Sequence, residues 1–429
     1  MRSLALIPLA LSFALSHLIA QDAAHASGKP TPAKIDNHLM IVEDSVVTEQ
    51  WAHTLKLVNT PQNVTLLNPG QCIRVGIVST GDNRDAFLQN TKLSFRVNFA
   101  GQTLDHPLAA LVQTKQIKPE GGDFVTAALA AADIKNPLLT MASLGVSADR
   151  WCVPDDAGDA IATVEGEAES PSGHQTLKPS TIQVESFETG SKKTFKSLED
   201  LGNFTESYYR QPNPARLVPA LQFVIQAQAA NQKTDIVSNA AAFLFAALKA
   251  DPVAANDFLR RIVTQQPMTR ALGLLILHSA AYDVSSVLKT LSAEDQQKVQ
   301  SLPPLANPYD LTPTREIFGH LDLMWSTFEA TGQFEPVKTI ASVLGWRQDY
   351  EDFDAARKAP DDHLTLTPSV VRGVAYTAAG WSLGSFQRND PLVADYIEYM
   401  LASPDTPPII KSELAGLSGN PAFKQTSGR

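Results

Sequence analysis

The spacing of apolar residues changes near residue 191, and this change constrains the fold of the 429-residue chain more than any other feature. Between residues 36 and 190 apolar and polar residues alternate, as Phe95 and Val97 do around Arg96. A period of two is typical of half-buried β-strands. From residue 197 onward apolar residues recur every three or four positions, as in amphipathic helices. The sequence therefore predicts two domains, the first β and the second α.

Short strand patterns fill the first domain, for which we predict the boundaries 36–190. Turn clusters such as Asn68-Pro69-Gly70 and Asp155-Asp156-Ala157-Gly158 separate them. Many short strands at this spacing favour an antiparallel β-sandwich, with which an immunoglobulin-like topology is compatible. The Ala-rich stretch 124–134 fits either a short helix or a strand.

The first 26 residues have the pattern of a secretory signal peptide. Arg2 precedes an apolar run from Leu4 to Leu15, and Ala24-His25-Ala26 fits a signal-peptidase site. A cut after Ala20 is the alternative. The run is too short for a membrane anchor. We expect residues 1–26 to be removed, residues 27–35 to be flexible, and the protein to be periplasmic or secreted, with no integral membrane segment after cleavage.

Cys72 and Cys152 are the two cysteines of the chain. In an exported protein an even pair predicts one disulfide, and two free thiols are the alternative. A disulfide closing a loop of this length would stabilise the fold by roughly 4 kcal/mol in the chain-entropy model. Neither cysteine belongs to a Cys-x-x-Cys motif, so the sequence offers no support for redox catalysis.

Helix starts in the second domain are marked by a capping side chain followed by proline. The capping oxygen accepts a free amide, and proline has no amide to leave unpaired at the first helical position. The predicted starts are Asn213-Pro214, Asp251-Pro252, Thr312-Pro313, Thr367-Pro368, Asp390-Pro391 and Thr406-Pro407. We predict a linker at 191–196, about eleven helices over 197–418, and a flexible tail at 419–429.

A weak internal repeat favours helical hairpins. Trp325-Ser326 is followed by Pro336, and Trp381-Ser382 by Pro391, so that an aromatic helix is each time followed by a helix that begins near proline. Phe245 and Pro252 have the same arrangement. Hairpins with an uncovered apolar face stack into an array, so a solenoid-like domain is expected; an irregular bundle is the alternative.

Three short segments of this second half resemble an uncharacterised family of secreted bacterial proteins with a helical C-terminal half. They are Leu321–Trp325, Ala330–Gly332 and Ala378–Leu383. The resemblance covers about the last 120 residues. It implies no activity that could be assigned to this chain.

Two sequence motifs suggest chemistry but lack the context that the chemistry needs. Gly380-Trp381-Ser382-Leu383-Gly384 matches the Gly-x-Ser-x-Gly elbow of α/β hydrolases, which needs a strand before the serine and a histidine after it. The residues before Ser382 have a helical pattern, and the last histidine is His363. We therefore expect Trp381 and Leu383 to face a helical core. Glu316 and His320 are four residues apart on a helix expected from Pro313, where they would form either half of a metal site or a surface pair.

Acidic and aromatic residues of the second half are the remaining candidates for a site. The acids of residues 349–363 would collect calcium or supply paired carboxylates for glycoside hydrolysis, but cations interrupt them, as on a solvated helix. Trp325, Trp346 and Trp381 would line a groove for sugars or a peptide, or fill a core. No cofactor motif is complete, so we predict no cofactor, no metal and no catalytic residue.

Two functions fit these observations. The net charge of −10 and the lack of a Lys- or Arg-rich run oppose binding to nucleic acid. The first hypothesis is an exported, non-catalytic interaction module that binds a protein or peptide through its helical domain. The alternative is a glycan-active enzyme in which a β-sandwich precedes a small helical toroid, which would need two carboxylates facing one cleft.

Overall fold

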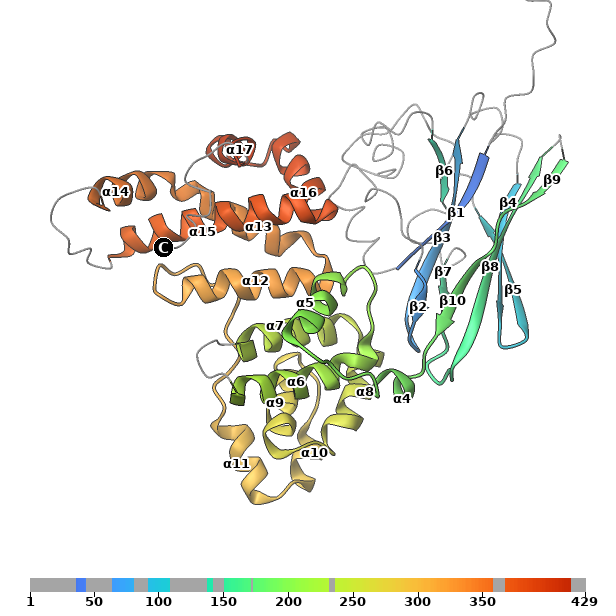
Figure 1. Cartoon of the computed structure of the whole chain (residues 1–429), viewed down its shortest axis with the longest axis horizontal. Helices are drawn as coiled ribbons and strands as arrows, with labels where there is room; N and C mark the ends of the chain where they lie inside the picture. The colour runs from blue at the N-terminus through green and yellow to red at the C-terminus, as the bar shows by residue number, and fades with distance from the viewer. Residues whose placement is uncertain are drawn as a thin grey trace, which may run out of the picture.

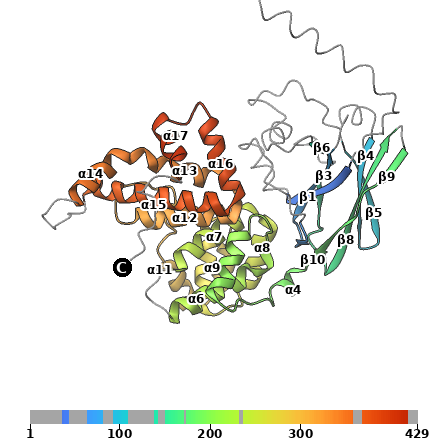
Figure 2. The same cartoon turned by 45° about the horizontal axis from the view of Figure 1, so that its top comes forward.

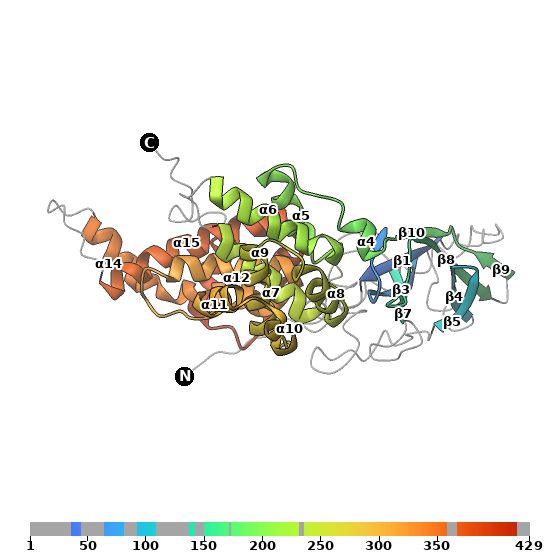
Figure 3. The ribbon, with the colours of Figure 1, turned by 90° about the horizontal axis from the view of Figure 1, so that it is seen from below.

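The computed structural model describes most of the chain from residue 36 to residue 417. The described residues are 36–43, 64–80, 92–108, 137–141, 150–170, 173–230, 236–357 and 367–417. The predicted signal peptide, the predicted flexible N-terminus and tail, and the Ala-rich stretch 124–134 lie outside them. A sheet-rich N-terminal part is followed by a helical C-terminal half, and the two lie side by side (Figures 1–3).

The N-terminal part contains two sheets within the described residues. In the first sheet β3 (Cys72–Thr80) pairs with three strands, β1 (Asp36–Glu43), β6 (Pro137–Met141) and β7 (Arg150–Cys152). The second sheet has the order β2 (Leu66–Leu67), β10 (Ser180–Val184), β8 (Ala160–Ser170), β4 (Lys92–Phe99) and β5 (Gln102–Leu108), with β9 (Gly173–Thr176) paired to β8. All these pairs are antiparallel except β2 with β10.

Side chains of both sheets share one buried cluster. Ile41 and Val75 of the first sheet and Val97 and Val164 of the second are fully buried in it. The alternation predicted for β4 is confirmed, because Val97 is buried while the neighbouring Arg96 reaches the surface and pairs with Glu167 at 3.3 Å. The period of two thus places every second side chain in this core.

The predicted cysteine pair lies within the first sheet. The sulfur atoms of Cys72 and Cys152 are 2.06 Å apart, on residues that face each other in β3 and β7. Trp151 beside them is buried, and its ring meets the ring of Phe99 edge-on at 5.5 Å between centroids. The disulfide therefore joins neighbouring strands next to the shared core.

The helical half starts after α4 (Phe187–Gly190), which lies between the two parts (Figure 1). Its helices are α5 (Leu198–Ser207), α6 (Leu217–Ala230, after the short η2, Pro214–Arg216), α7 (Ile236–Ala250), α8 (Pro252–Ile262), α9 (Pro267–Ser279), α10 (Ser285–Thr290), α11 (Ala293–Ser301), α12 (Ile317–Thr331), α13 (Phe334–Ser342), η3 (Val343–Trp346), α14 (Arg347–Arg357), α15 (Pro368–Asn389), α16 (Pro391–Ala402) and α17 (Pro408–Ala415). The transition from strands to helices falls near the predicted position.

Two buried cores hold these helices together. The first helical core collects side chains of α5 to α9, such as Leu221, Leu244 and Phe258. The second collects side chains of α12 to α17, such as Phe328 and Tyr396. Helix α12 contributes to both and lies between α7 on one side and α13 and α15 on the other (Figure 1).

Several helix starts occur where capping side chains precede proline. Asp251, Thr367 and Asp390 accept hydrogen bonds from the first-turn amides of α8, α15 and α16. The start expected at Thr312-Pro313 is wrong. Asp310 accepts hydrogen bonds from the backbone and hydroxyl of Thr312, which forms a turn there instead, and α12 begins only at Ile317.

The pairs α7–α8, α12–α13 and α15–α16 correspond to the three matches of the internal repeat. Within each pair the two helices are in contact across a short connection. At the Asp251-Pro252 and Asp390-Pro391 connections, proline prevents the first helix from continuing, and the aspartate side chain caps the start of the next helix.

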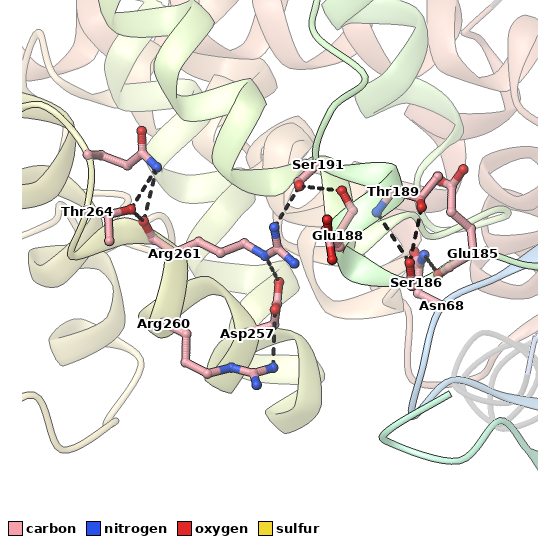
Figure 4. A network of polar contacts seen from close by, with 11 residues as sticks. Asn68, Glu185, Ser186, Glu188, Thr189, Ser191, Asp257, Arg260, Arg261 and Thr264 are labelled. Atoms are coloured by element: carbon pink, nitrogen blue, oxygen red, sulfur yellow. Dashed lines mark hydrogen bonds and ion pairs between the residues drawn. The ribbon is translucent and has the colours of Figure 1, made fainter. Parts of the chain in front are cut away.

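Polar contacts link the sheet-rich part to the helical half around α4 (Figure 4). The Asn68 side-chain amide donates to the carbonyl of Glu185 at 2.6 Å, and Arg261 of α8 donates to the hydroxyl of Ser191 at 2.6 Å. Asp257, itself buried, accepts from Arg261 at 2.6 Å. The Arg261–Ser191 bond holds α8 against the end of α4, and the Asn68–Glu185 bond fixes the chain just before α4 to the turn after β2.

Candidate functional site: an apolar cavity in the helical half

A cavity of about 1150 Å³ opens in the helical half between α6, α7, α9 and α12. Helices α6, α7 and α9 contact one another, and α12 packs on α7 (Figures 1 and 3). Ligand sites of proteins are commonly 300–1,000 Å³ and mostly apolar, so this cavity is as large as the larger known sites.

One face of each wall helix supplies the apolar lining. On α9 the lining residues Met268, Leu272 and Leu275 recur at helical spacing, and on α7 the side chains are smaller, as at Ala242 and Ala246. Alanines on α7 leave the space, because a methyl group does not reach the opposite wall. Met268 is 52% exposed at the rim, although methionine is usually buried.

The segment Leu302–Tyr309 closes part of the cavity. It contains three prolines and no helix or strand, and it runs from the end of α11 toward α12. Leu302 and Leu305 pack against the first helical core. The cavity walls therefore already contact one extended, apolar piece of chain.

Among the described residues that line the cavity, Lys249 is the one that carries a charge. It lies in the last turn of α7, with its ammonium 5.5 Å from the centroid of the Phe245 ring, which also lines the cavity. Within the described residues no carboxylate forms an ion pair with it, whereas Lys298 and Lys338 each pair with a glutamate of their own helix.

The other polar groups of the lining are hydroxyls and amides. The hydroxyls of Thr327 and Thr331 donate to the carbonyls of Leu323 and Thr327 in α12, so these donors are already used. Tyr309 lies at the rim, and burial, followed by the nearby Glu335, raises the pKa of its phenol. The phenol is therefore a neutral hydrogen-bonding group at ordinary pH.

The acids predicted as a cluster are paired in the structure with neighbouring side chains. Asp349 accepts two hydrogen bonds from Arg372 and one from Ser369, which hold the pKa of its carboxyl below the usual value. Glu351 pairs with Arg347 at 3.0 Å, and Asp354 with Arg357 at 3.0 Å. These contacts fix α14 to itself and to α15. Asp361, Asp362 and His363 lie outside the described residues.

Glu316 and His320 lie near each other at the start of α12. Glu316 is the residue before α12, and a hydrogen bond from Thr314, with a smaller contribution from the charge of His320, lowers the pKa of its carboxyl. The ring of His320 lies with Nδ1 2.6 Å from the carbonyl oxygen of Asp310. Across the described residues there is no group of three or more His, Cys, Asp or Glu side chains that could hold a metal ion.

The three tryptophans do not line the cavity. Trp325 is buried in the second helical core and stacks on Phe386 at 3.8 Å between ring centroids, and Trp346 packs against the same core. Trp381 is 40% exposed, so the expectation that it faces a core is wrong, while Leu383 is fully buried as expected. Ser382 lies within α15 and donates to the carbonyl of Ala379 at 3.0 Å, in a helical setting unlike a hydrolase elbow.

No protein-family model, curated protein or solved structure matches this chain. The resemblance to secreted bacterial proteins thus stays an expectation from the sequence. Among the helices of the described stretches, none combines the length and the apolar character needed to cross a bilayer.

Proposed function

We propose that this chain is an exported, non-catalytic interaction module that binds a protein through a peptide segment held in the cavity of its helical half. The observation that carries this proposal is the cavity itself, with a volume of about 1150 Å³, apolar walls from four helices and an open rim. An apolar segment that enters it loses its contact with water, which is the main driving force for such binding.

The extended segment Leu302–Tyr309 favours a peptide as the occupant. Within the described residues, the backbone groups of residues 302–306 take part in no hydrogen bond with the protein. A peptide brings its own amides and carbonyls, which need partners when they leave water. An extended peptide beside residues 302–306 would pair some of these groups, as in strand-addition modes of recognition.

The alternative, a glycan-active enzyme, requires two carboxylates that face one cleft. The described lining of the cavity contains no carboxylate, and the acids of α14 are engaged with neighbouring side chains. These contacts support binding over glycan cleavage as the proposed function. In this proposal the two sheets form a β-sandwich that orients the module, and the helix pairs form the array that contains the cavity.

The test is to pan a library of random heptapeptides with free C-termini on the immobilised full chain and on two variants. Ala242→Phe places a phenyl ring in the cavity, because Ala242 lines it. Ala240→Phe is the matched control, since Ala240 lies on the same helix, is also half-buried and does not line the cavity. Thermal melting of both variants checks that they remain folded.

We expect apolar peptides to be enriched on the wild type and on Ala240→Phe, and enrichment to be lost on Ala242→Phe. Equal enrichment on all three proteins would place the binding outside the cavity and refute the proposal. The absence of enrichment on the folded wild-type chain would refute peptide binding altogether.

A further inference from the structure

The cavity has a defined length and two different ends. Helices α7 and α9 contact each other and run in the same direction, because α8 returns the chain between them. Their ends lie together: the hydroxyl of Tyr282, just after α9, donates to the carbonyl of Leu248 near the end of α7. The α7 lining extends from Val237 to Ala250, about 20 Å at 1.5 Å per residue. An extended peptide of about five or six residues has this length at 3.3 Å per residue.

The charge of the lining lies at one end. Lys249 stands in the last turn of α7, and Ser279 ends the neighbouring α9 beside it in the lining. Gln228 and Ser238 lie near the opposite end, where α6 ends and α7 begins. The described lining thus offers a cation and a hydroxyl at one end and neutral groups at the other, in a protein whose net charge is −10.

We infer that the occupant is an extended apolar peptide with a carboxylate that pairs with Lys249. This inference rests on the proposed function and deepens it by naming the chemistry of the peptide. Charge complementarity selects this occupant: within the described residues no carboxylate pairs with Lys249 and the lining contains no acid, so the site attracts an anion with an apolar body. The Phe245 ring near the ammonium reduces its hydration from that side, which strengthens an ion pair there.

A carboxylate at this position comes either from the C-terminus of a protein or from an Asp or Glu side chain. The C-terminal source would place the end of the peptide at Lys249 and its preceding apolar residues along α7 and α9. A side-chain source would allow the partner chain to continue past the end of the cavity at Lys249, because Lys249 and Ala250 are exposed there.

The experiment measures the affinity of the most enriched heptapeptides for the full chain and for two lysine variants. Lys249→Gln removes the charge in the cavity. Lys289→Gln is the matched control, because Lys289 also lies in the last turn of an exposed helix end and does not line the cavity. Each peptide is used as the free acid and as the C-terminal amide, so that the two sources of the carboxylate give different results.

We expect the enriched peptides to contain a carboxylate next to apolar residues. Lys249→Gln should weaken their binding about two- to fivefold and remove most of its salt dependence, while Lys289→Gln leaves both unchanged. Loss of affinity in the amide form would assign the terminal carboxylate, and retained affinity a side-chain carboxylate.

Peptides that lack a carboxylate, or that bind Lys249→Gln and the wild type equally, would overturn this inference while leaving the proposed function intact. Binding of the single-chain fatty acid hexadecanoate in the cavity, without enrichment of any peptide, would overturn both and identify a lipid chain as the occupant.

Discussion

Glu329 makes the stability of the helical half depend on pH in an unusual direction. It lies in the last turn of α12, where its charge opposes the helix macrodipole. Burial, followed by the nearby Glu206, raises the pKa of its carboxyl from 4.5 to about 8. The folded protein therefore binds a proton that the unfolded chain has released between these two pH values.

The sign of the effect follows from this difference. Below pH 4.5 the carboxyl is protonated in both states and has no influence; as pH rises to 8, the free energy of unfolding falls. A pKa raised from 4.5 to about 8 corresponds to at most roughly 5 kcal/mol, at 1.36 kcal/mol per pKa unit. Since the side chain keeps some contact with solvent, we expect about 2–3 kcal/mol.

The variant Glu329→Gln removes this dependence, because glutamine is neutral and still accepts a hydrogen bond from Thr205. Urea unfolding between pH 4.5 and 8.5 should show the variant gaining about 2–3 kcal/mol over the wild type as pH rises. Glu206→Gln should reduce the same difference, because it removes the neighbouring charge. Parallel stability curves for the wild type and Glu329→Gln over this range would refute the assignment.

Three further predictions concern stability. Replacing Cys72 and Cys152 by serine should lower the free energy of unfolding by about 2–4 kcal/mol in urea titrations, and an unchanged value would show that the disulfide does not form. Asp390→Ala should lower the free energy of unfolding by about 2–4 kcal/mol in the same assay, because Asp390 caps α16 and also accepts a hydrogen bond from the buried Tyr209. Loss of an exposed cap would cost only about 1 kcal/mol. Asp405→Ala, at an exposed site, is the control. Gly70→Ala should lower the melting temperature by several degrees, because Gly70 has φ +81° and an added Cβ would lie 2.7 Å from Val253 of α8. An unchanged melting temperature would argue against this contact between the two parts.

Local rules predicted the elements of this fold well. The change of period near residue 191, the alternation in β4 and the caps at Asp251, Thr367 and Asp390 depend on residues close in sequence, and all appear in the structure. The start of α12 differs from the prediction because the hydroxyl of Thr312, which would cap a helix from Pro313, is bound to Asp310 in a local turn. Trp381 was misplaced because α15 buries small residues such as Ala375, Ala379 and Gly380 on the face toward the core and leaves the tryptophan on another.

The cavity could not be predicted from the sequence, because its lining comes from four helices and consists of residues that also form ordinary cores. Ala242 and Leu275 have no feature that separates them from fully buried neighbours such as Leu244 and Leu277. The sequence feature that points toward the cavity is the proline-rich segment Leu302–Tyr309, because its residues are too apolar for a simple exposed loop.

The most direct test of the account is the affinity of one enriched peptide for the full chain and for Ala242→Phe, measured by titration calorimetry at several temperatures. A phenyl ring in the cavity displaces about one apolar side chain of the peptide, worth about 1.5–3 kcal/mol, so Ala242→Phe should weaken binding at least about tenfold. The wild type should show a negative heat-capacity change on binding, as expected when apolar surface is buried, and Ala240→Phe should match it. Equal affinity of the wild type and a folded Ala242→Phe variant would contradict the claim that the helical half binds its partner in this cavity.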